Sequence, residues 1–150
     1  MRATFLTALA CSVLALPALA DEAWQTNMGP IIWEQTLGSD AVLRLYSGED
    51  ESQVDVRMIV PGLGDDMMGG RGTYTGLWIA YDGDVACSVE MVDPLGGKSA
   101  YWGTFTLTFL EDGFPSDWAG AYGECLNPPS APIQAHALVG DERASAPLGN

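Results

Sequence analysis

The chain offers few residues for nucleophilic or metal-assisted catalysis. Its one histidine is His136, it has three cysteines, and no GxSxG sequence occurs in its 150 residues. Hydrolysis by serine or cysteine needs a base beside the nucleophile, and zinc sites need Cys and His ligands at short spacing. Neither pattern is present, and Asp82-Gly83-Asp84 lacks the spacing of a calcium-binding EF-hand. We therefore expect no metal, no cofactor and no catalytic residue, and we interpret His136 as structural.

Carboxylates are the one class of chemically active side chain that this sequence has in abundance. The chain has 20 acidic residues against six basic ones, and its net charge is −14. Because paired carboxylates can hydrolyse glycosides, a small hydrolase using Glu34, Asp93 and Glu124 stays open as an alternative. With so many acids in one small domain, some pair will be close by chance, so this signal is not specific.

Residues 1–20 have the pattern of a secretory signal peptide. Arg2 precedes an apolar run that ends in Ala18-Leu19-Ala20, and a charged start, an apolar segment and a small-x-small site are typical of cleaved signals. The run is too short for a membrane span. We expect cleavage after Ala20, no membrane span afterwards, and a periplasmic or secreted protein. Lipid attachment at Cys11 is the alternative, but it lacks the expected leucine three positions earlier.

Cleavage leaves two cysteines, Cys87 and Cys125. An even number of cysteines in an exported chain predicts a disulfide. A bridge between these two closes a loop long enough to stabilise the fold by roughly 4 kcal/mol in the chain-entropy model.

Cleavage also makes the chain more acidic. Loss of Arg2 leaves five basic residues against 20 acidic ones, a net charge of −15. Such a surface repels nucleic acid and anionic lipid, so we expect no nucleic-acid partner. The charge favours a cationic protein as partner, although acidity also keeps exported proteins soluble.

Apolar and polar residues alternate along most of the mature chain, which predicts strands. The predicted strands are 31–37, 41–47, 53–60, 74–81, 84–91, 100–110, 117–125 and 133–139. Seven or eight short strands joined by Gly, Asp and Pro turns indicate an all-β fold, either a small antiparallel sandwich or a barrel. We expect a single domain over 21–140, with no periodicity in 21–30 and a loose tail at 141–150.

The centre of the chain predicts a tight hairpin. Asp82-Gly83 lies between two alternating runs and is a strong two-residue turn signal. A hairpin centred there places Trp78 opposite Cys87, with the disulfide beside this tryptophan in the core.

Two places indicate ligand contact. Trp102 lies on the threonine-rich face of its strand, where an aromatic ring could bind a glycan or a protein; the alternative is that a loop or second sheet covers it. The glycine-rich stretch 61–72 carries Met67, Met68 and Arg71, and loops on rigid β scaffolds often carry function. A plain connector is the alternative there.

One short motif resembles a known family. Gly76-Leu77-Trp78 resembles the G-x-W of lipocalin-like barrels, in which this motif lies near the mature N-terminus, whereas here about 55 mature residues precede it. The layout is also broadly similar to that of small, disulfide-bearing bacterial inhibitors of proteases and lysozymes, although no motif diagnostic of them is present.

These observations favour an exported, acidic, non-enzymatic β protein of the bacterial cell envelope that binds a protein or a glycan. An inhibitor of a cationic enzyme is a specific version of this hypothesis. A carboxylate-dependent hydrolase and a purely structural envelope component are the alternatives.

Overall fold

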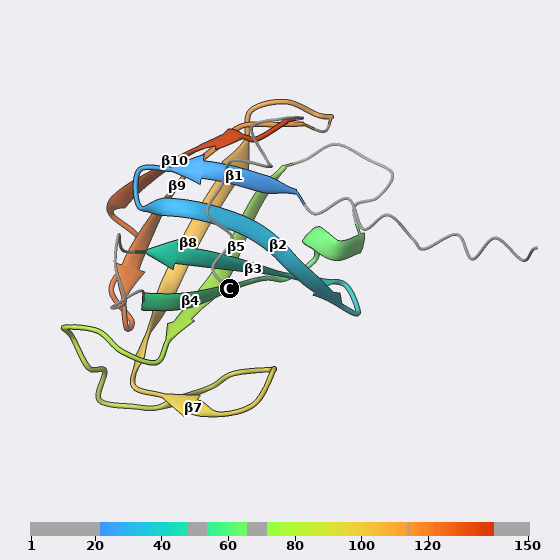
Figure 1. Ribbon diagram of the computed structural model, residues 1–150. Helices are drawn as coiled ribbons and strands as arrows, with labels where there is room; N and C mark the ends of the chain where they lie inside the picture. Colours follow the sequence, from blue (N-terminus) through green and yellow to red (C-terminus); the bar gives the residue numbers. More distant parts are fainter. Residues whose placement is uncertain (1–21, 48–53, 66–71, 114, 140–150) are drawn as a thin grey trace, which may run out of the picture.

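The computed structural model describes residues 22–47, 54–65, 72–113 and 115–139, which form a closed antiparallel β-barrel (Figure 1). Its eight strands are β1 (Ala23–Thr26), β2 (Gly29–Leu37), β3 (Asp40–Ser47), β4 (Val54–Val60), β5 (Thr73–Ala80), β8 (Tyr101–Phe109), β9 (Trp118–Glu124) and β10 (Ala131–Ala137). They follow one another in the order β1-β10-β9-β8-β5-β4-β3-β2. A separate two-stranded sheet consists of β6 (Met91–Val92) and β7 (Lys98–Ser99), and η1 (Leu63–Asp65) is a 3-10 turn.

The all-β prediction is confirmed, and of its two forms the barrel is the one observed. The predicted signal peptide at 1–20 and the tail at 141–150 lie outside the described residues.

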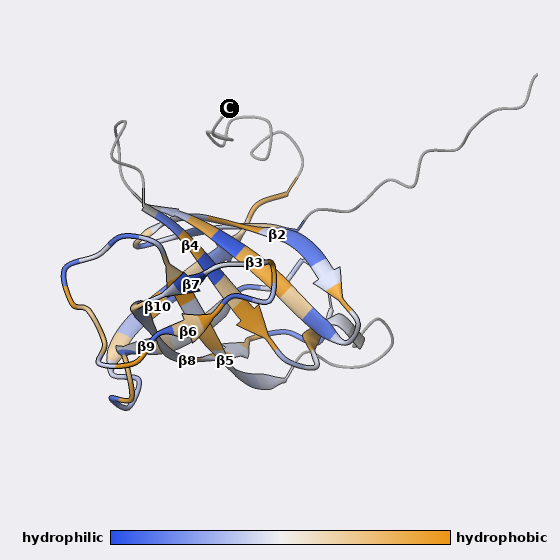
Figure 2. Ribbon diagram, turned by 90° about the horizontal axis from the view of Figure 1, so that it is seen from below, coloured by the Kyte–Doolittle hydropathy of each residue, from blue (hydrophilic) through white to orange (hydrophobic). Residues whose placement is uncertain are grey.

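Side chains of the barrel wall alternate between its inner and outer faces, as a period of two requires. In β3 and β4, Leu43 lies opposite Met58 and both are at most 2% exposed. The neighbouring pair, Arg44 opposite Arg57, faces outward. Figure 2 shows this alternation as bands of hydrophobic and hydrophilic residues along the two strands. The inward-facing residues of the eight strands form the main core.

Aromatic side chains fill one end of the barrel. Trp24, Phe109 and Trp118 are at most 5% exposed, and the ring of Trp24 lies 6.3 Å from each of the other two rings. The indole N–H of Trp24 donates to the carbonyl of Ser116 at 2.9 Å, in the connection between β8 and β9. This packing closes the end at which β8 finishes, and leaves the end at which β8 begins as the mouth of the barrel.

The predicted hairpin around Asp82-Gly83 is wrong. β5 pairs with β8, from Thr73 opposite Thr108 to Ala80 opposite Tyr101, and residues 81–90 form no strand. Trp78 therefore lies opposite Gly103 and not opposite Cys87. Two valines that a hairpin would bury are exposed, Val85 by 47% and Val89 by 63%. β8, which is rich in threonine and aromatic residues, pairs with β5 along the whole length of β5. Such cross-strand pairs stabilise a sheet, and here they outweigh the preference of Asp82-Gly83 for a tight turn.

Residues 81–99, here called the outer strap, cross the outside of β4, β5 and β8 (Figure 2). Ile59, Ile79 and Trp102 face outward from these three strands, yet they are at most 8% exposed. Cys87 and Met91 of the strap pack against them. This part of the wall therefore has a core on each side.

The predicted disulfide between Cys87 and Cys125 is confirmed, with the two Cα atoms 5.5 Å apart. Its expected position beside Trp78 in the core is wrong. The amide of Cys87 donates to Ala100 at 2.7 Å, and that of Cys125 donates to Trp102 at 2.8 Å. The bridge thus lies at the start of β8, on the outer side of the wall, and ties the strap to the residue that follows β9.

One strand, β1, falls in the stretch where the sequence shows no periodicity. It closes the barrel, because Trp24 pairs with Ile31 of β2 on one side and with Ala137 of β10 on the other. Its four residues are too few for alternation to be recognisable.

Candidate functional site in the barrel mouth

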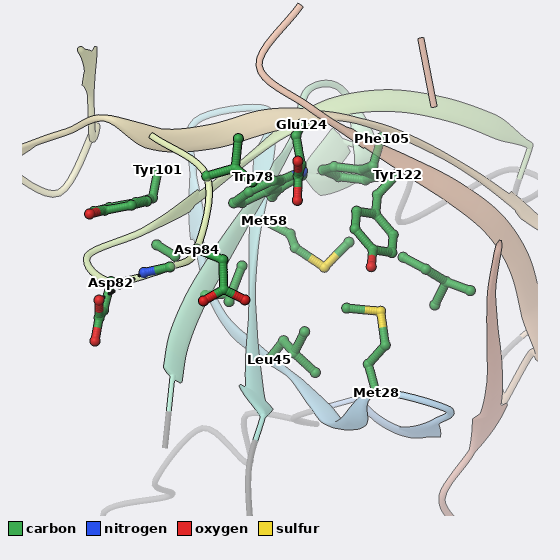
Figure 3. Close-up of a pocket in the computed structure, with 15 residues that line it drawn as sticks. Met28, Leu45, Met58, Trp78, Asp82, Asp84, Tyr101, Phe105, Tyr122 and Glu124 are labelled. Atoms are coloured by element: carbon green, nitrogen blue, oxygen red, sulfur yellow. Dashed lines mark hydrogen bonds between the residues drawn. The ribbon is translucent and has the colours of Figure 1, made fainter. Parts of the chain in front are cut away.

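The mouth of the barrel contains a cavity of about 190 Å³ (Figure 3). The residues that line it are Met28, Leu45, Val56, Met58, Trp78, Ala80, Asp82, Gly83, Asp84, Val85, Tyr101, Phe105, Tyr122, Glu124 and Ile133. Most are inward-facing residues near the strand ends that meet at the mouth, and four come from the beginning of the outer strap. An interior cavity at the mouth of a β-barrel is a common place for a small-molecule site.

The floor of the cavity is apolar and buried. Leu45, Met58, Phe105 and Ile133 are each at most 3% exposed. Above them the side chain of Met28 enters from the β1–β2 turn, and Figure 3 shows its sulfur and that of Met58 both turned into the cavity. Unbranched thioether side chains adapt to irregular shapes, so this floor can accommodate more than one apolar group.

Two glycines allow the aromatic rings to lie close to the wall. Gly76 pairs with Phe105, and Gly103 pairs with Trp78. A Cβ atom at Gly76 would come within 2.6 Å of the Phe105 ring, and one at Gly103 within 2.6 Å of the Trp78 Nε1 atom. The glycine of the Gly76-Leu77-Trp78 motif therefore makes room for a ring on the neighbouring strand. Without these close approaches, both rings would move toward the barrel axis and fill the cavity.

The Trp78 ring is held in a fixed orientation. Its indole N–H donates to the carbonyl of Gly123 at 3.0 Å, and the ring of Tyr122 meets it edge to face at a centroid distance of 6.5 Å and an interplanar angle of 82°. A buried indole usually satisfies its N–H in this way. The hydrogen bond engages the edge of the indole ring, and the ring forms part of the cavity wall.

The rim of the cavity is acidic. Asp82 and Asp84 reach it from the strap and Glu124 from the end of β9, and all three are exposed. Asp82 accepts a hydrogen bond from the amide of Gly83 at 2.9 Å. In the part of the chain that the structure describes, the carboxylates of Asp84 and Glu124 have neither an ion pair nor a hydrogen-bonding side chain beside them. The rim therefore carries negative charge that no neighbouring group neutralises.

A buried carboxylate anchors the strap that supplies two of the three rim carboxylates. The Asp93 side chain is 0% exposed and accepts hydrogen bonds from Arg57 at 2.7 Å, from the Tyr81 hydroxyl at 2.7 Å and from the Leu95 amide at 2.8 Å. Burial alone raises the pKa of Asp93, but these three donors outweigh it and lower the pKa. The hydrogen bond to Asp93 also raises the pKa of Tyr81. Tyr81 immediately precedes Asp82, so this anchor fixes the point at which the strap leaves the mouth.

The structure brings two of the three carboxylates of the hydrolase hypothesis to the same arginine and separates the third from them. Glu34 and Asp93 both lie on the outer face against Arg57, at 3.6 Å and 2.7 Å from its nitrogens, whereas Glu124 lies at the mouth. His136 is 75% exposed and contacts Asp117 at 2.9 Å. The Ala137 amide and then His136 lower the pKa of Asp117. Among the described residues, no group of three or more His, Cys, Asp or Glu side chains is arranged to hold a metal ion.

The other predicted site residues divide into two groups. Trp102 is 5% exposed, and its indole donates to the Val89 carbonyl of the strap at 2.7 Å. A loop therefore covers it, which is the alternative that the sequence left open. Met67, Met68 and Arg71 lie outside the described residues.

Sequence reasoning missed the cavity because it assigned the inward-facing residues to a filled core. The available signal was the inward pair Gly76 and Gly103, each opposite an aromatic ring, since a glycine in a strand often marks close approach of another group.

No protein-family model matches this chain. Comparisons with curated proteins and with solved structures also find no significant match. In the described part of the chain there is no helix with the length and apolar character needed to cross a membrane. The geometry of the mouth therefore carries the functional argument by itself.

Proposed function

We propose that this protein is an exported, non-enzymatic binding protein that takes a small apolar group into the mouth of its barrel. The observation that carries the proposal is the apolar cavity of about 190 Å³ between the buried floor and the exposed rim. An engineered apolar cavity of about 150 Å³ binds benzene, so this one has room for a ring with a few attached carbon atoms. Export is supported by the signal-like residues 1–20 and by the disulfide, which is typical of oxidising compartments.

A small molecule is favoured over a protein partner because the aromatic residues line a hollow. Trp78 and Tyr122 are partly buried and face the cavity, and Phe105 is 1% exposed at its floor. A flat protein partner cannot reach these rings, whereas a small ligand can. A protein could reach them only by inserting a single side chain. No observation favours the hydrolase, because Arg57 pairs with both Glu34 and Asp93 on the outer face and Glu124 lies apart from them at the mouth.

The methionines allow a direct test. Protein labelled with ¹³C at the methionine methyl groups would be titrated with toluene and followed by NMR. We expect the Met28 and Met58 signals to shift, because both line the cavity. Met91 is the internal control, because it belongs to the outer strap and packs against the outer side of the wall, away from the cavity.

A matched pair of variants completes the test. Val56→Phe places extra atoms in the cavity that Val56 lines and is expected to abolish the shifts. Val92→Phe makes the same substitution at a site 61% exposed on the strap and should leave them intact. Unchanged Met28 and Met58 signals in the wild-type protein, or equal shifts in the Val56→Phe variant, would refute the proposal.

A further inference from the structure

Asp84 and Glu124 lie at the opening of a cavity whose inner walls are apolar and aromatic. We propose that the ligand of this site is a small amphipathic cation, with an aromatic or short aliphatic body in the cavity and an ammonium group at the rim. This inference rests on the proposed function and adds the chemical class of the ligand.

The polarity of the cavity changes along its depth. Met58 and Phe105 are buried at the floor, whereas Asp84 and Glu124 are exposed at the rim. Figure 3 shows Asp84 on one side of the cavity and Tyr122 on the other, with the Met58 sulfur between them in this view. A ligand that fills this space must be apolar at its inner end and must tolerate carboxylates at its outer end.

Within the described residues, no basic side chain compensates these carboxylates. The described residues that line the cavity include no lysine or arginine. The basic residues of the nearby wall are used elsewhere, because Arg44 and Arg57 lie on the outer face in ion pairs with Asp55 and Asp93. A site with charge of one sign and low-dielectric walls concentrates ligands of the opposite charge. It also repels fatty acids and other apolar anions, since their head groups would meet like charge at the rim.

The aromatic rings add a second attraction for a cation. Trp78, Tyr101, Phe105 and Tyr122 contribute four rings to the cavity lining. Cations bind to the faces of such rings, tryptophan most strongly. The hydrogen bond from the Trp78 indole N–H to the Gly123 carbonyl already fixes the Trp78 ring. A bound ligand therefore does not have to immobilise this ring. Rings and carboxylates in one hollow are the combination that recognises alkylated ammonium groups.

The cavity volume limits the size of the ligand. At about 190 Å³ it exceeds the engineered cavity of about 150 Å³ that accepts benzene by only a few carbon atoms. A benzylammonium-sized molecule fits this space, whereas a long acyl chain cannot be enclosed in it.

Three probes that share a benzyl group separate charge from shape. Benzyltrimethylammonium is the cation, neopentylbenzene is its uncharged isostere, and phenylacetate is an anion. Calorimetric titration at low ionic strength is expected to show at least about tenfold tighter binding of the cation than of the isostere, and no binding of phenylacetate. Added salt should weaken binding of the cation only.

A double variant tests the assigned carboxylates. Asp84→Asn with Glu124→Gln should lower the affinity for the cation at least about tenfold and leave the affinity for neopentylbenzene unchanged. The matched control is Glu111→Gln with Asp112→Asn, which removes the same charge from the connection between β8 and β9 at the plugged end. This control variant should bind all three probes as the wild-type protein does.

The outcomes distinguish the two proposals. If neopentylbenzene binds as tightly as the cation, or if the rim variant binds the cation normally, the amphipathic-cation inference is wrong and the proposed function stands. If none of the three probes binds and the Met28 and Met58 signals do not move with toluene, the proposed function itself is wrong.

Discussion

The ion pair between Asp93 and Arg57 allows a controlled measurement of what burial adds to stability. Asp93 and Arg57 are 2.7 Å apart, and Asp55 and Arg44 are 2.6 Å apart. Arg44 and Arg57 are themselves paired across β3 and β4. The carboxylates differ in exposure, since the Asp93 side chain is 0% exposed and that of Asp55 is 37% exposed. Replacing each aspartate by alanine therefore removes an arginine ion pair from two different environments, and at Asp93 it also removes the hydrogen bonds from Tyr81 and Leu95.

We expect Asp93→Ala to lower the free energy of unfolding by about 2–4 kcal/mol. Breaking a buried ion pair typically costs about 3–5 kcal/mol. The cost is reduced here because Arg57 keeps Glu34 at 3.6 Å and the Tyr81 hydroxyl keeps the carbonyl of Gly96 at 2.9 Å. For Asp55→Ala we expect about 1 kcal/mol or less, as for other solvent-exposed pairs.

Urea unfolding at neutral pH, with the disulfide intact and tryptophan fluorescence as the signal, measures both values. Equal losses in the two variants would show that distance and not burial sets the contribution of these pairs. A loss below about 1 kcal/mol for Asp93→Ala would refute the claim that this carboxylate anchors the strap.

The same variant predicts a pH dependence. The pKa of Asp93 is lowered from its ordinary value of 3.8, so the folded state binds this proton less readily than the unfolded state. The stabilisation is therefore complete at a pH above about 4, and it is lost as the pH falls through the lowered pKa. The difference in stability between the wild-type protein and Asp93→Ala should shrink on acidification below this point, and a constant difference would contradict the assignment.

Two further predictions concern the mouth and the disulfide. Gly103→Ala would place a Cβ atom 1.9 Å from the Gly123 carbonyl oxygen and 2.6 Å from Trp78 Nε1; we expect a loss of about 1–3 kcal/mol from overpacking and an altered near-ultraviolet circular dichroism spectrum. Joint replacement of Cys87 and Cys125 by alanine should cost about 2–4 kcal/mol in thermal or urea unfolding. A wild-type spectrum in the first variant, or unchanged stability in the second, would contradict these expectations.

The strands of the barrel could be read from the sequence wherever one face is buried and the other is solvated. β3 and β4 show this plainly, since Leu43 and Met58 face the core while Arg44 and Arg57 face outward. The disulfide could be predicted from the two cysteines that remain once residues 1–20 are interpreted as a signal peptide. Sequence pattern is enough in these cases because it reports directly which side of a strand meets water.

The incorrectly predicted hairpin around Asp82-Gly83 shows the limit of predicting strands from alternating polarity. Residues 84–91 alternate in polarity, but in the structure the strap uses Cys87 and Met91 to cover the outward-facing Ile59, Ile79 and Trp102. Alternation indicates that one side of a segment is apolar, and does not indicate whether a strand or an irregular segment uses it. The choice depends on β8, a partner far along the chain, which pairs with β5 in full register.

The candidate site was harder to predict because a cavity is defined by atoms that are missing. Met28 lies in a stretch without periodicity and Ile133 in a predicted strand, and they line a space because the rings of Trp78 and Phe105 lie close over Gly103 and Gly76. The acidic rim is likewise assembled from the strap and from β9. Such an arrangement follows from three-dimensional packing and has no local signature.

The pairing of β1 with β10 has a consequence for how the chain reaches this fold. Ala23–Thr26 is the first strand of the barrel to be synthesised and Ala131–Ala137 is the last, and each needs the other to complete its hydrogen bonds. Contacts between such distant segments form slowly, and until they form the sheet has two open edges. Open edges can pair with other chains, so the period between the appearance of the first strand and that of the last is when this protein is most exposed to aggregation.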